Sequence, residues 1–334
     1  MLYIIVDGFF GDTGKGKVAA YLALADKPAL CVRTGAPNAG HTVTLDGRQH
    51  VLRTLPTCFV SPETRLAVAP GALIKIDVFL SEVERYGRGR SYLDFHTGVV
   101  EERHVEAERR DEYLMKVVGS TGQGVGAAMV DRVLRRLKLA KDFDELKPYL
   151  ADVSAMIHEH KSSGVVIEGT QGTFLSLYHG TYPYVTSRDV TASGILSEAG
   201  VGPKAVDEVV LVFKAYVTRV GGGPLPGELT PEEAERRGWA ERGAVTGRPR
   251  RAAPFNTELA KRAVLLNTPT QIAIMKIDAL FREAAGKTRW ADLPTEARRW
   301  VEEVEEQLKV PVTLIGTGPE PRHMVDLRRE RGRG

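Results

Sequence analysis

The residues best suited to chemistry stand close to the N-terminus, in the stretch GFFGDTGKGKV that follows the apolar run LYIIV. Gly11, Gly14 and Gly16 allow backbone N–H groups to approach an anion closely. Lys15 and Lys17 add positive charge beside them. This combination at the end of an apolar run favours a phosphate-binding loop over the structural alternative, a plain glycine-rich turn.

This loop departs from the usual P-loop, which has glycine, four residues, Gly-Lys and then serine or threonine. The segment from Gly8 to Gly14 is one residue too long, and Gly16 stands where the magnesium-binding hydroxyl is expected. Magnesium therefore needs another oxygen, and Asp12 lies inside the loop. Because a carboxylate among phosphates is repelled unless a metal or a protonatable substrate lies beside it, we interpret Asp12 as a metal ligand or general base.

A second cluster, GAPNAGHTV, also follows an apolar run. Asn38, Gly40 and His41 place an amide, a flexible backbone and a titratable imidazole close together. A single histidine is more often structural, but this one is expected at the carboxyl end of a strand, where α/β sheets bind ligands. We therefore favour a role for His41 as an acid or a phosphate contact.

The rest of the chain alternates short apolar runs with helical patterns, and several runs are apolar throughout, as in strands covered on both faces. Strands are predicted at 2–6, 29–33, 65–69, 164–168, 208–213, 271–277 and 311–315, and helices at 75–86, 141–161, 256–266 and 294–308. The alternation predicts an α/β fold, a single large domain with a central mostly parallel β-sheet flanked by helices and a P-loop-like phosphate loop after the first strand. We expect the domain to span residues 1–326, and residues 327–334 to form a solvated basic tail.

Composition narrows the class of protein. The chain is 43% apolar and 27% charged, as in a soluble globular protein with a substantial core. Its net charge of +3 is small, and we expect no nucleic-acid partner. No apolar run approaches the ~18 residues of a membrane span, so we expect no membrane partner and a cytoplasmic location. Cys31 and Cys58 lack metal-ligand spacing; reduced thiols are favoured, and a single bridge between them stays open.

Seven motifs together resemble a known family. They are GDTGKGK, NAGHTV, STGQGVG, EGTQGTFLSLYHGTYPYVTS, VTGRPRR, MKID and GTGPE, and they span nearly the whole chain. In this order they resemble adenylosuccinate synthetase, and the short chain is similar to its compact archaeal-type branch. The resemblance implies a GTP-dependent ligase of purine biosynthesis that forms a C–N bond. It would join L-aspartate to IMP through 6-phosphoryl-IMP and release adenylosuccinate, GDP and phosphate, with Mg²⁺ as cofactor.

The resemblance also implies catalytic roles. Asp12 would remove the N1 proton of IMP, after which the 6-oxygen attacks the γ-phosphate of GTP. Lys15 would stabilise the transferred phosphoryl group, His41 would donate to the GTP phosphates, and Gln171 would contact the base near its 6-position. Asp12 and the carbonyl of Gly40 would hold magnesium.

Three substrate-binding sets follow from the same motifs. The GTP set is Gly11, Asp12, Thr13, Gly14, Lys15, Gly16, Lys17, Gly40, His41, Thr42, Lys276, Asp278, Gly316 and Gly318. The IMP set is Asp12, Asn38, Ala39, Gly40, His41, Thr121, Arg135, Gln171, Thr186 and Arg248. The aspartate set is Val245, Thr246, Gly247, Arg248 and Arg250, and its guanidinium groups suit a dicarboxylic amino acid. Arg135 would reach the active site of the partner subunit, so a homodimer is implied.

Some positions depart from the family pattern. Thr13 stands where glutamate is usual, and Gln123 and Pro249 stand where arginines are usual. A related branch acts on dGMP with an altered loop aspartate, so the presence of Asp12 favours IMP. A third alternative is a regulatory GTP-binding switch without a synthetic reaction. The missing hydroxyl after Lys15 argues against it. So does the MKID motif, which echoes the guanine-reading Asn-Lys-x-Asp of GTPases but begins with Met275 in place of asparagine.

Overall fold

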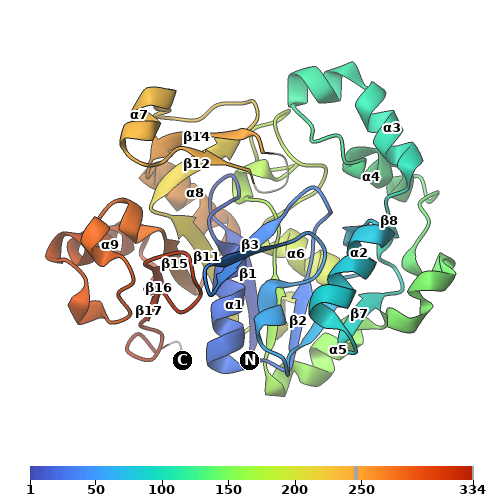
Figure 1. The fold of residues 1–334 in the computed structure, drawn as a ribbon, viewed down its shortest axis with the longest axis horizontal. Helices are drawn as coiled ribbons and strands as arrows, with labels where there is room; N and C mark the ends of the chain where they lie inside the picture. The colour runs from blue at the N-terminus through green and yellow to red at the C-terminus, as the bar shows by residue number, and fades with distance from the viewer. Residues whose placement is uncertain (244–246, 333–334) are drawn as a thin grey trace.

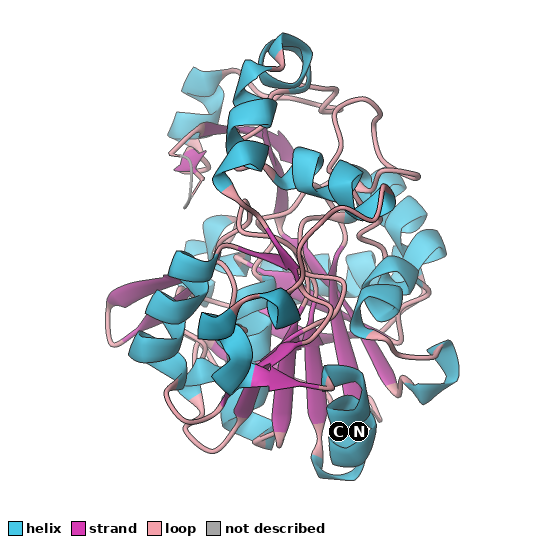
Figure 2. Cartoon of the chain, turned by 90° about the vertical axis from the view of Figure 1, so that its right-hand side faces the viewer, coloured by secondary structure: helices cyan, strands magenta, loops and turns pink. Residues whose placement is uncertain are grey.

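The computed structural model describes residues 1–243 and 247–332. Within them, ten strands form one sheet, and every neighbouring pair is parallel except the last two at one edge. Figures 1 and 2 show helices on both faces of this sheet, which confirms the predicted α/β fold with a mostly parallel sheet. The strand order is β9 (Leu150–Ala151), β7 (Ser91–Asp94), β5 (Arg65–Val68), β2 (Leu30–Arg33), β10 (Val165–Glu168), β1 (Leu2–Asp7), β11 (Glu208–Lys214), β15 (Gln271–Met275), β16 (Val312–Gly316) and β17 (Met324–Asp326).

Strand β1 shows why these runs are apolar throughout. Leu2, Ile4 and Val6 pack into the core on one face of the sheet, and Tyr3 and Ile5 pack into the core on the other. Because both faces are covered, a strand here needs no polar side, and all seven predicted strands belong to this sheet. One core includes α5 (Val153–His160), α6 (Ala192–Ala199), α8 (Thr257–Asn267) and α9 (Thr295–Leu308), and the other includes α1 (Lys15–Asp26) and α2 (Ile76–Glu82).

Three of the four predicted helices correspond to α2, α8 and α9, but the helix predicted over 141–161 is wrong in its first half. There the chain forms two 3-10 segments and then strand β9, and α5 begins only at Val153. Pro148 lacks the N–H that an α-helix interior requires. Asp152 then starts α5 by accepting a hydrogen bond from the backbone N–H of Ala155 at 2.8 Å.

Smaller units gather at the carboxyl end of the central sheet (Figure 1). An antiparallel sheet of β12 (Tyr216–Val220), β14 (Pro249–Pro254) and β13 (Glu241–Arg242) lies beside α7 (Pro231–Arg236), and helices α3 (Glu102–Arg110) and α4 (Val125–Val133) lie on the other side. Strands β3 (His41–Leu45) and β4 (Arg48–Leu52) form an antiparallel hairpin, and β6 (Leu73–Ile74) pairs with β8 (Gly98–Val99). These units enclose the end of the sheet where the phosphate loop is found.

The two cysteines are joined. Cys31 on β2 and Cys58 in a 3-10 turn form a disulfide with their Cα atoms 6.3 Å apart, and both residues are fully buried. The expectation of two reduced thiols is therefore wrong, and the bridge that the sequence left open is present.

The expected solvated tail begins later than residue 327. Leu327 and Arg328 are buried, and Nη2 of Arg328 lies 2.7 Å from Oδ2 of Asp326 and 3.0 Å from Oδ1 of Asp26. These two residues pack against the body of the protein, and the division of the chain at residue 326 stays a prediction. In the described part of the chain, no helix is long and apolar enough to pass through a membrane.

Candidate active site

The loop after β1 presents backbone donors at the start of helix α1. Gly14 caps the helix with a φ of 105°, a left-handed conformation that glycine adopts without strain. The first N–H groups of a helix have no carbonyl partner within it, and the helix dipole adds positive potential at the same end. The geometry therefore suits a phosphate group.

Asp7, the last residue of β1, holds this loop in place through hydrogen bonds to its carboxylate. It is fully buried, and its Oδ1 accepts from the N–H of Phe9 at 2.8 Å and of Gly11 at 3.2 Å. Its Oδ2 accepts from the Thr13 hydroxyl at 2.6 Å and from the Lys15 ammonium at 2.9 Å. The sequence analysis gave Asp7 no role, although a carboxylate that ends an apolar strand before a glycine-rich loop was a usable signal.

His41 is held by a buried carboxylate that the sequence analysis also missed. Nδ1 of His41 hydrogen-bonds Oε1 of Glu168, and Oε2 of Glu168 accepts from the N–H of Thr57 at 2.7 Å. Burial alone would raise the pKa of Glu168, but His41, Arg33 and Thr57 lower it to about 2. Glu168 is therefore a carboxylate, and it fixes which ring nitrogen of His41 faces away from it.

The same surroundings act on the imidazole. Burial and the neighbouring Arg33 lower the pKa of His41 to about 4, although Glu168 opposes them. A neutral imidazole that donates to Glu168 through Nδ1 presents Nε2 as an acceptor. Donation from Nε2 to a phosphate therefore requires the imidazolium form, which an adjacent anion favours.

Gly16 lies close against the residues that support His41, and a side chain there would crowd them. A Cβ atom there would lie 3.0 Å from Cβ of His41 and 3.1 Å from Cγ2 of Thr57. We expect Gly16→Ala to displace His41 and to lower kcat/KM about tenfold or more, which corresponds to about 1.4 kcal/mol. Gly126→Ala in α4 is the matched control, since nothing lies within 4 Å of the added atom. Equal steady-state kinetics for the two variants would contradict this account.

The phosphate loop faces a cavity of about 570 Å³, and all four predicted catalytic residues line it. They are Asp12, Lys15, His41 and Gln171. Other predicted residues in the lining are Gly11, Thr13, Gly14, Gly16, Lys17, Asn38, Ala39, Gly40, Thr42, Thr121, Arg248, Arg250, Lys276 and Gly318. Lining residues that the sequence analysis did not predict include Thr44, Gln49, Lys214, Glu241 and Arg242.

The cavity lining does not include five of the predicted residues. Gly316 lies behind it, where an added Cβ would be 3.0 Å from Nζ of Lys17. Arg135 is exposed just after α4, so it adds nothing to the cavity of its own chain. The others are Thr186, Gly247 and Asp278. Val245 and Thr246 lie outside the described residues.

The buried side-chain oxygen atoms that lack hydrogen-bond partners among the described residues include Oδ1 of Asn38 and Oδ1 of Asp278. Asn38 lines the cavity, and Asp278 follows the lining residue Lys276 by two positions. A buried acceptor without a donor costs about 1–3 kcal/mol, so each atom suits a donor group on a ligand.

Lys17 is buried at the edge of the cavity, where its ammonium donates to the carbonyls of Gly318 at 2.6 Å and His323 at 2.8 Å. Burial is the largest cause of a pKa lowered to about 7, and Lys276 lowers it further while Asp278 opposes the shift. Near neutral pH this lysine is thus poised between its charged and neutral forms.

Asp12 stands at the mouth of the cavity in a left-handed conformation, with a φ of 58°. Its Oδ1 lies 2.9 Å from Nη2 of Arg250. The described residues contain no group of three His, Cys, Asp or Glu side chains able to hold a metal. Mg²⁺ commonly binds one or two carboxylates together with substrate phosphates and water, so a single aspartate beside a phosphate loop fits its chemistry.

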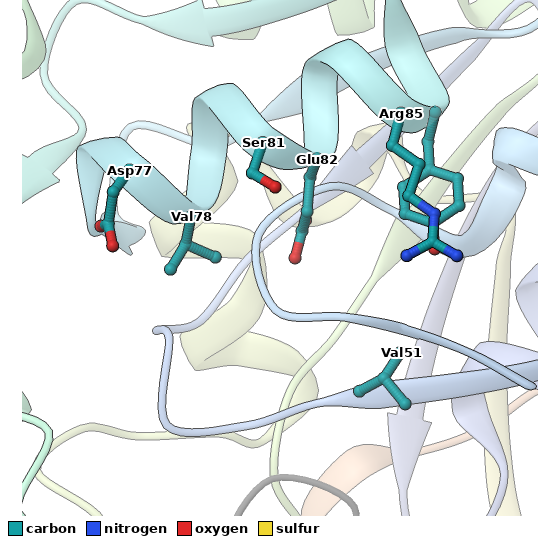
Figure 3. Close-up of a pocket in the computed structure, with 7 residues that line it drawn as sticks. Val51, Asp77, Val78, Ser81, Glu82 and Arg85 are labelled. Atoms are coloured by element: carbon teal, nitrogen blue, oxygen red, sulfur yellow. The ribbon is translucent and has the colours of Figure 1, made fainter.

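A second hollow of about 290 Å³ lies between β4 and α2, away from the phosphate loop. Figure 3 shows Asp77, Ser81, Glu82 and Arg85 along the helix above Val51. Glu82 is engaged there, since it accepts from the N–H groups that follow β4. This hollow therefore does not belong to the candidate active site.

Comparisons with known proteins agree with the geometry. The family model described as "Adenylosuccinate synthetase" matches residues 4–143 and 137–285. The adenylosuccinate synthetase of Archaeoglobus fulgidus is 49% identical over 332 residues, which cover 98% of both chains. That of Methanocaldococcus jannaschii is 48% identical over 334 residues, covering 98% of this chain and 97% of the relative. The chain belongs to the adenylosuccinate synthetase family.

The solved structures of two synthetases share the fold of this protein. A fully ligated adenylosuccinate synthetase from Plasmodium falciparum has a TM-score of 0.88 at 23% identity, covering 97% of this chain and 99% of the other. A succinoaminodeoxyadenylate synthetase of cyanophage S-2L, bound to dGMP and dATP as an energy donor, has a TM-score of 0.79 at 26% identity, covering 97% and 95%. The family resemblance carried by the seven motifs is thus confirmed.

Proposed function

We propose that the protein joins L-aspartate to IMP at the expense of GTP and releases adenylosuccinate, GDP and phosphate. The observation that carries this proposal is the convergence of Asp12, Lys15, His41 and Gln171 on one cavity at the N-terminus of α1. The chemistry follows from the substrate, because an oxo group on a purine leaves poorly and its phosphorylated form leaves well.

In this mechanism Asp12 accepts the N1 proton of IMP, and the 6-oxygen then attacks the γ-phosphate of GTP. The first N–H groups of α1 and the ammonium of Lys15 offset the charge on the moving phosphoryl group. Lys15 is already aligned by Asp7 and by the carbonyl of Gln171, at 2.5 Å. The amine of aspartate then displaces phosphate, and the C–N bond forms.

Binding roles follow from the remaining residues. Asp278, with its unpartnered oxygen, accepts from the N1–H and 2-amino groups of guanine. Arg250, with Arg248, binds the carboxylates of aspartate, and Arg248 meanwhile donates to the carbonyls of Gly119 and Ser120, each at 2.7 Å. Asp12 and the carbonyl of Gly40 are the residues that would hold magnesium, which supplies neutralising charge to the phosphates when bound.

A nucleotide panel tests this function. Purified protein is supplied with GTP, aspartate and Mg²⁺ together with IMP, GMP or dGMP, and products are separated by chromatography. We expect adenylosuccinate from IMP and no ligation product from the other two. A product from dGMP alone would assign the related branch instead. GTP hydrolysis that does not respond to IMP and aspartate would assign a switch.

Nucleotide binding should weaken as the pH rises from about 7 to about 9.5. Phosphate favours the charged form of Lys17, whose pKa in the free protein is about 7, so binding takes up a proton. The stability of the free protein changes with pH in the opposite direction to its nucleotide affinity. Because the unfolded chain binds more protons in this window, Lys17 makes the free energy of unfolding rise with pH.

Titration calorimetry with GDP, in buffers of different ionisation enthalpy, measures this proton uptake. Lys17→Met removes this titrating group, so its GDP affinity should change less across the same window than that of the wild type. A wild-type affinity that does not change with pH would contradict the coupling.

We also propose a cytoplasmic homodimer in which Arg135 completes the partner's IMP site. Arg135→Ala and Asp12→Ala should each be inactive alone, but an equal mixture should recover about a quarter of wild-type activity, because half of the dimers then hold one intact site. Dissociation and reassociation before the assay allow exchange of subunits. No recovery despite exchange, measured with differently tagged chains, would exclude a shared site.

A further inference from the structure

Glu241 is a partly buried carboxylate in the lining of the cavity, with a side chain 12% exposed. Its Oε1 accepts from the Tyr216 hydroxyl and from Nζ of Lys276 at 2.7 Å. Its Oε2 accepts from Nζ of Lys214 at 3.1 Å and from Nη1 of Arg250. Four donors therefore meet at one carboxylate.

A carboxylate offers about four lone-pair positions, and here the protein uses all of them. Glu241 is thus unsuited to serve as a general base or a metal ligand while these contacts persist. Burying a carboxylate is unfavourable unless it is paired, but one cation would suffice for that. The convergence of three cations shows that the arrangement holds the cations as much as it satisfies Glu241.

The three cations come from different parts of the fold. Lys276 follows β15 and stands two residues before Asp278, the proposed guanine contact. Arg250 lies on β14 opposite Glu241 in the small antiparallel sheet, and its other nitrogen contacts Asp12. Lys214 ends β11, is buried, and also donates to the hydroxyl of Thr218 at 2.6 Å. Glu241 therefore lies between the proposed base end and the proposed amino-acid end of the cavity.

We propose that Glu241 is a positioning residue for two substrate subsites at once, orienting Lys276 toward the guanine nucleotide and Arg250 toward the carboxylate of the amino acid. This inference rests on the proposed function, because that function assigns the two subsites. It adds a residue to which the motifs assigned no role.

The effect of removing the charge can be worked out from the contacts. Without Glu241, the ammonium of buried Lys214 and the guanidinium of Arg250 repel each other with no carboxylate between them, and the more exposed ammonium of Lys276 adds to the repulsion. Asp12 is then the one carboxylate within the described residues that forms an ion pair with Arg250. Arg250 is drawn to Asp12 and away from the incoming amino acid, while Lys276 loses the partner that fixes it. One substitution should therefore weaken two separate binding steps.

Glu241→Gln, which keeps size and removes the charge, tests this proposal. Two constants are measured: the dissociation constant of GDP in the absence of other substrates, by calorimetry, and the KM for L-aspartate at saturating GTP and IMP. We expect each to rise about tenfold or more, with a smaller change in kcat, because each subsite loses a charge-assisted hydrogen bond. Glu241→Asp, which keeps the charge at a shorter reach, should recover part of both.

Glu228→Gln is the matched control. Glu228 pairs with Arg251, the neighbour of Arg250 on β14, and neither residue lines the cavity. The Glu228→Gln variant should leave the dissociation constant of GDP and the KM for L-aspartate within about twofold of the wild type. A purely structural role for Glu241 predicts a lower melting temperature with unchanged constants in the fraction that stays folded.

The outcomes are separable. A change in one constant only, in neither, or equally in Glu228→Gln overturns the proposal. If Glu241→Gln does not fold, Glu241→Asp decides by the same two constants: a smaller rise in both supports the proposal, and any other result overturns it. If the wild-type protein forms no product from IMP, the proposed function itself fails, and the GDP constant still tests the Lys276 half.

Discussion

Asp12→Ala should lower adenylosuccinate formation about a thousandfold or more, within the range that a positioned general base contributes. GTP should still bind, because most of its proposed contacts, among them the N–H groups of α1, Lys15 and Lys17, stay in place when the Asp12 carboxylate is removed. Removing the carboxylate also frees Nη2 of Arg250 from its ion pair. Product formation by single turnover and GTP affinity by calorimetry separate the catalytic effect from a binding effect.

Asp46→Ala is a matched control, since Asp46 is exposed and has a similar left-handed φ, 47° against 58° for Asp12. Both variants place alanine in a conformation that disfavours it, so any common loss reflects the backbone. Asp46 does not line the cavity, and this variant should keep nearly full activity. Near-normal product from Asp12→Ala would exclude the base assignment.

Asp7→Asn is expected to have the second largest effect, because it breaks the buried support of the phosphate loop. An amide keeps one acceptor oxygen but turns two donors toward the N–H groups or the Lys15 ammonium that Asp7 now satisfies. Leaving a buried cation without its partner costs about 3–5 kcal/mol. We expect that loss in the free energy of unfolding, together with GDP affinity at least about a hundredfold weaker, which corresponds to about 2.8 kcal/mol.

Denaturant unfolding and GDP titration measure the two effects of Asp7→Asn. Asp292→Asn provides the comparison, since Asp292 pairs with Arg289 at the surface, where water and salt screen the pair and its contribution to stability is small. If Asp7→Asn binds GDP as the wild type does, the carboxylate does not shape the loop.

The sheet was predictable because burial on both faces leaves a simple signature, a run such as LYIIV with no polar side. The helix predicted over 141–161 failed because its apolar spacing was read across Pro148 and across Asp152, which caps a new helix. Local spacing records which faces are apolar. It does not record where an imino acid or a capping carboxylate interrupts the hydrogen-bond ladder.

The residues of the site also fall into two groups, those that could be predicted from the sequence and those that could not. Asp12 and His41 stand in glycine-rich segments whose composition signals ligand binding, so their type and position could be predicted. Glu168 and Glu241 act through contacts with residues far along the chain, and only the folded structure pairs Glu168 with Thr57 or Glu241 with Lys276. The close neighbours of Gly16 are likewise set by the fold, since an added Cβ would lie 3.0 Å from Cβ of His41 and 3.1 Å from Cγ2 of Thr57.

The Cys31–Cys58 bond has a consequence for the segment that carries Asn38 and His41. The bond spans a sequence separation of 27, and the closed ring contains Asn38, His41 and the hairpin of β3 and β4. Both ends of this ring are attached to the body of the protein, one through β2 and the other through the disulfide bond. Even when the hairpin is locally unfolded, the segment that carries Asn38 and His41 therefore stays attached to the body of the protein at both ends and cannot separate far from it.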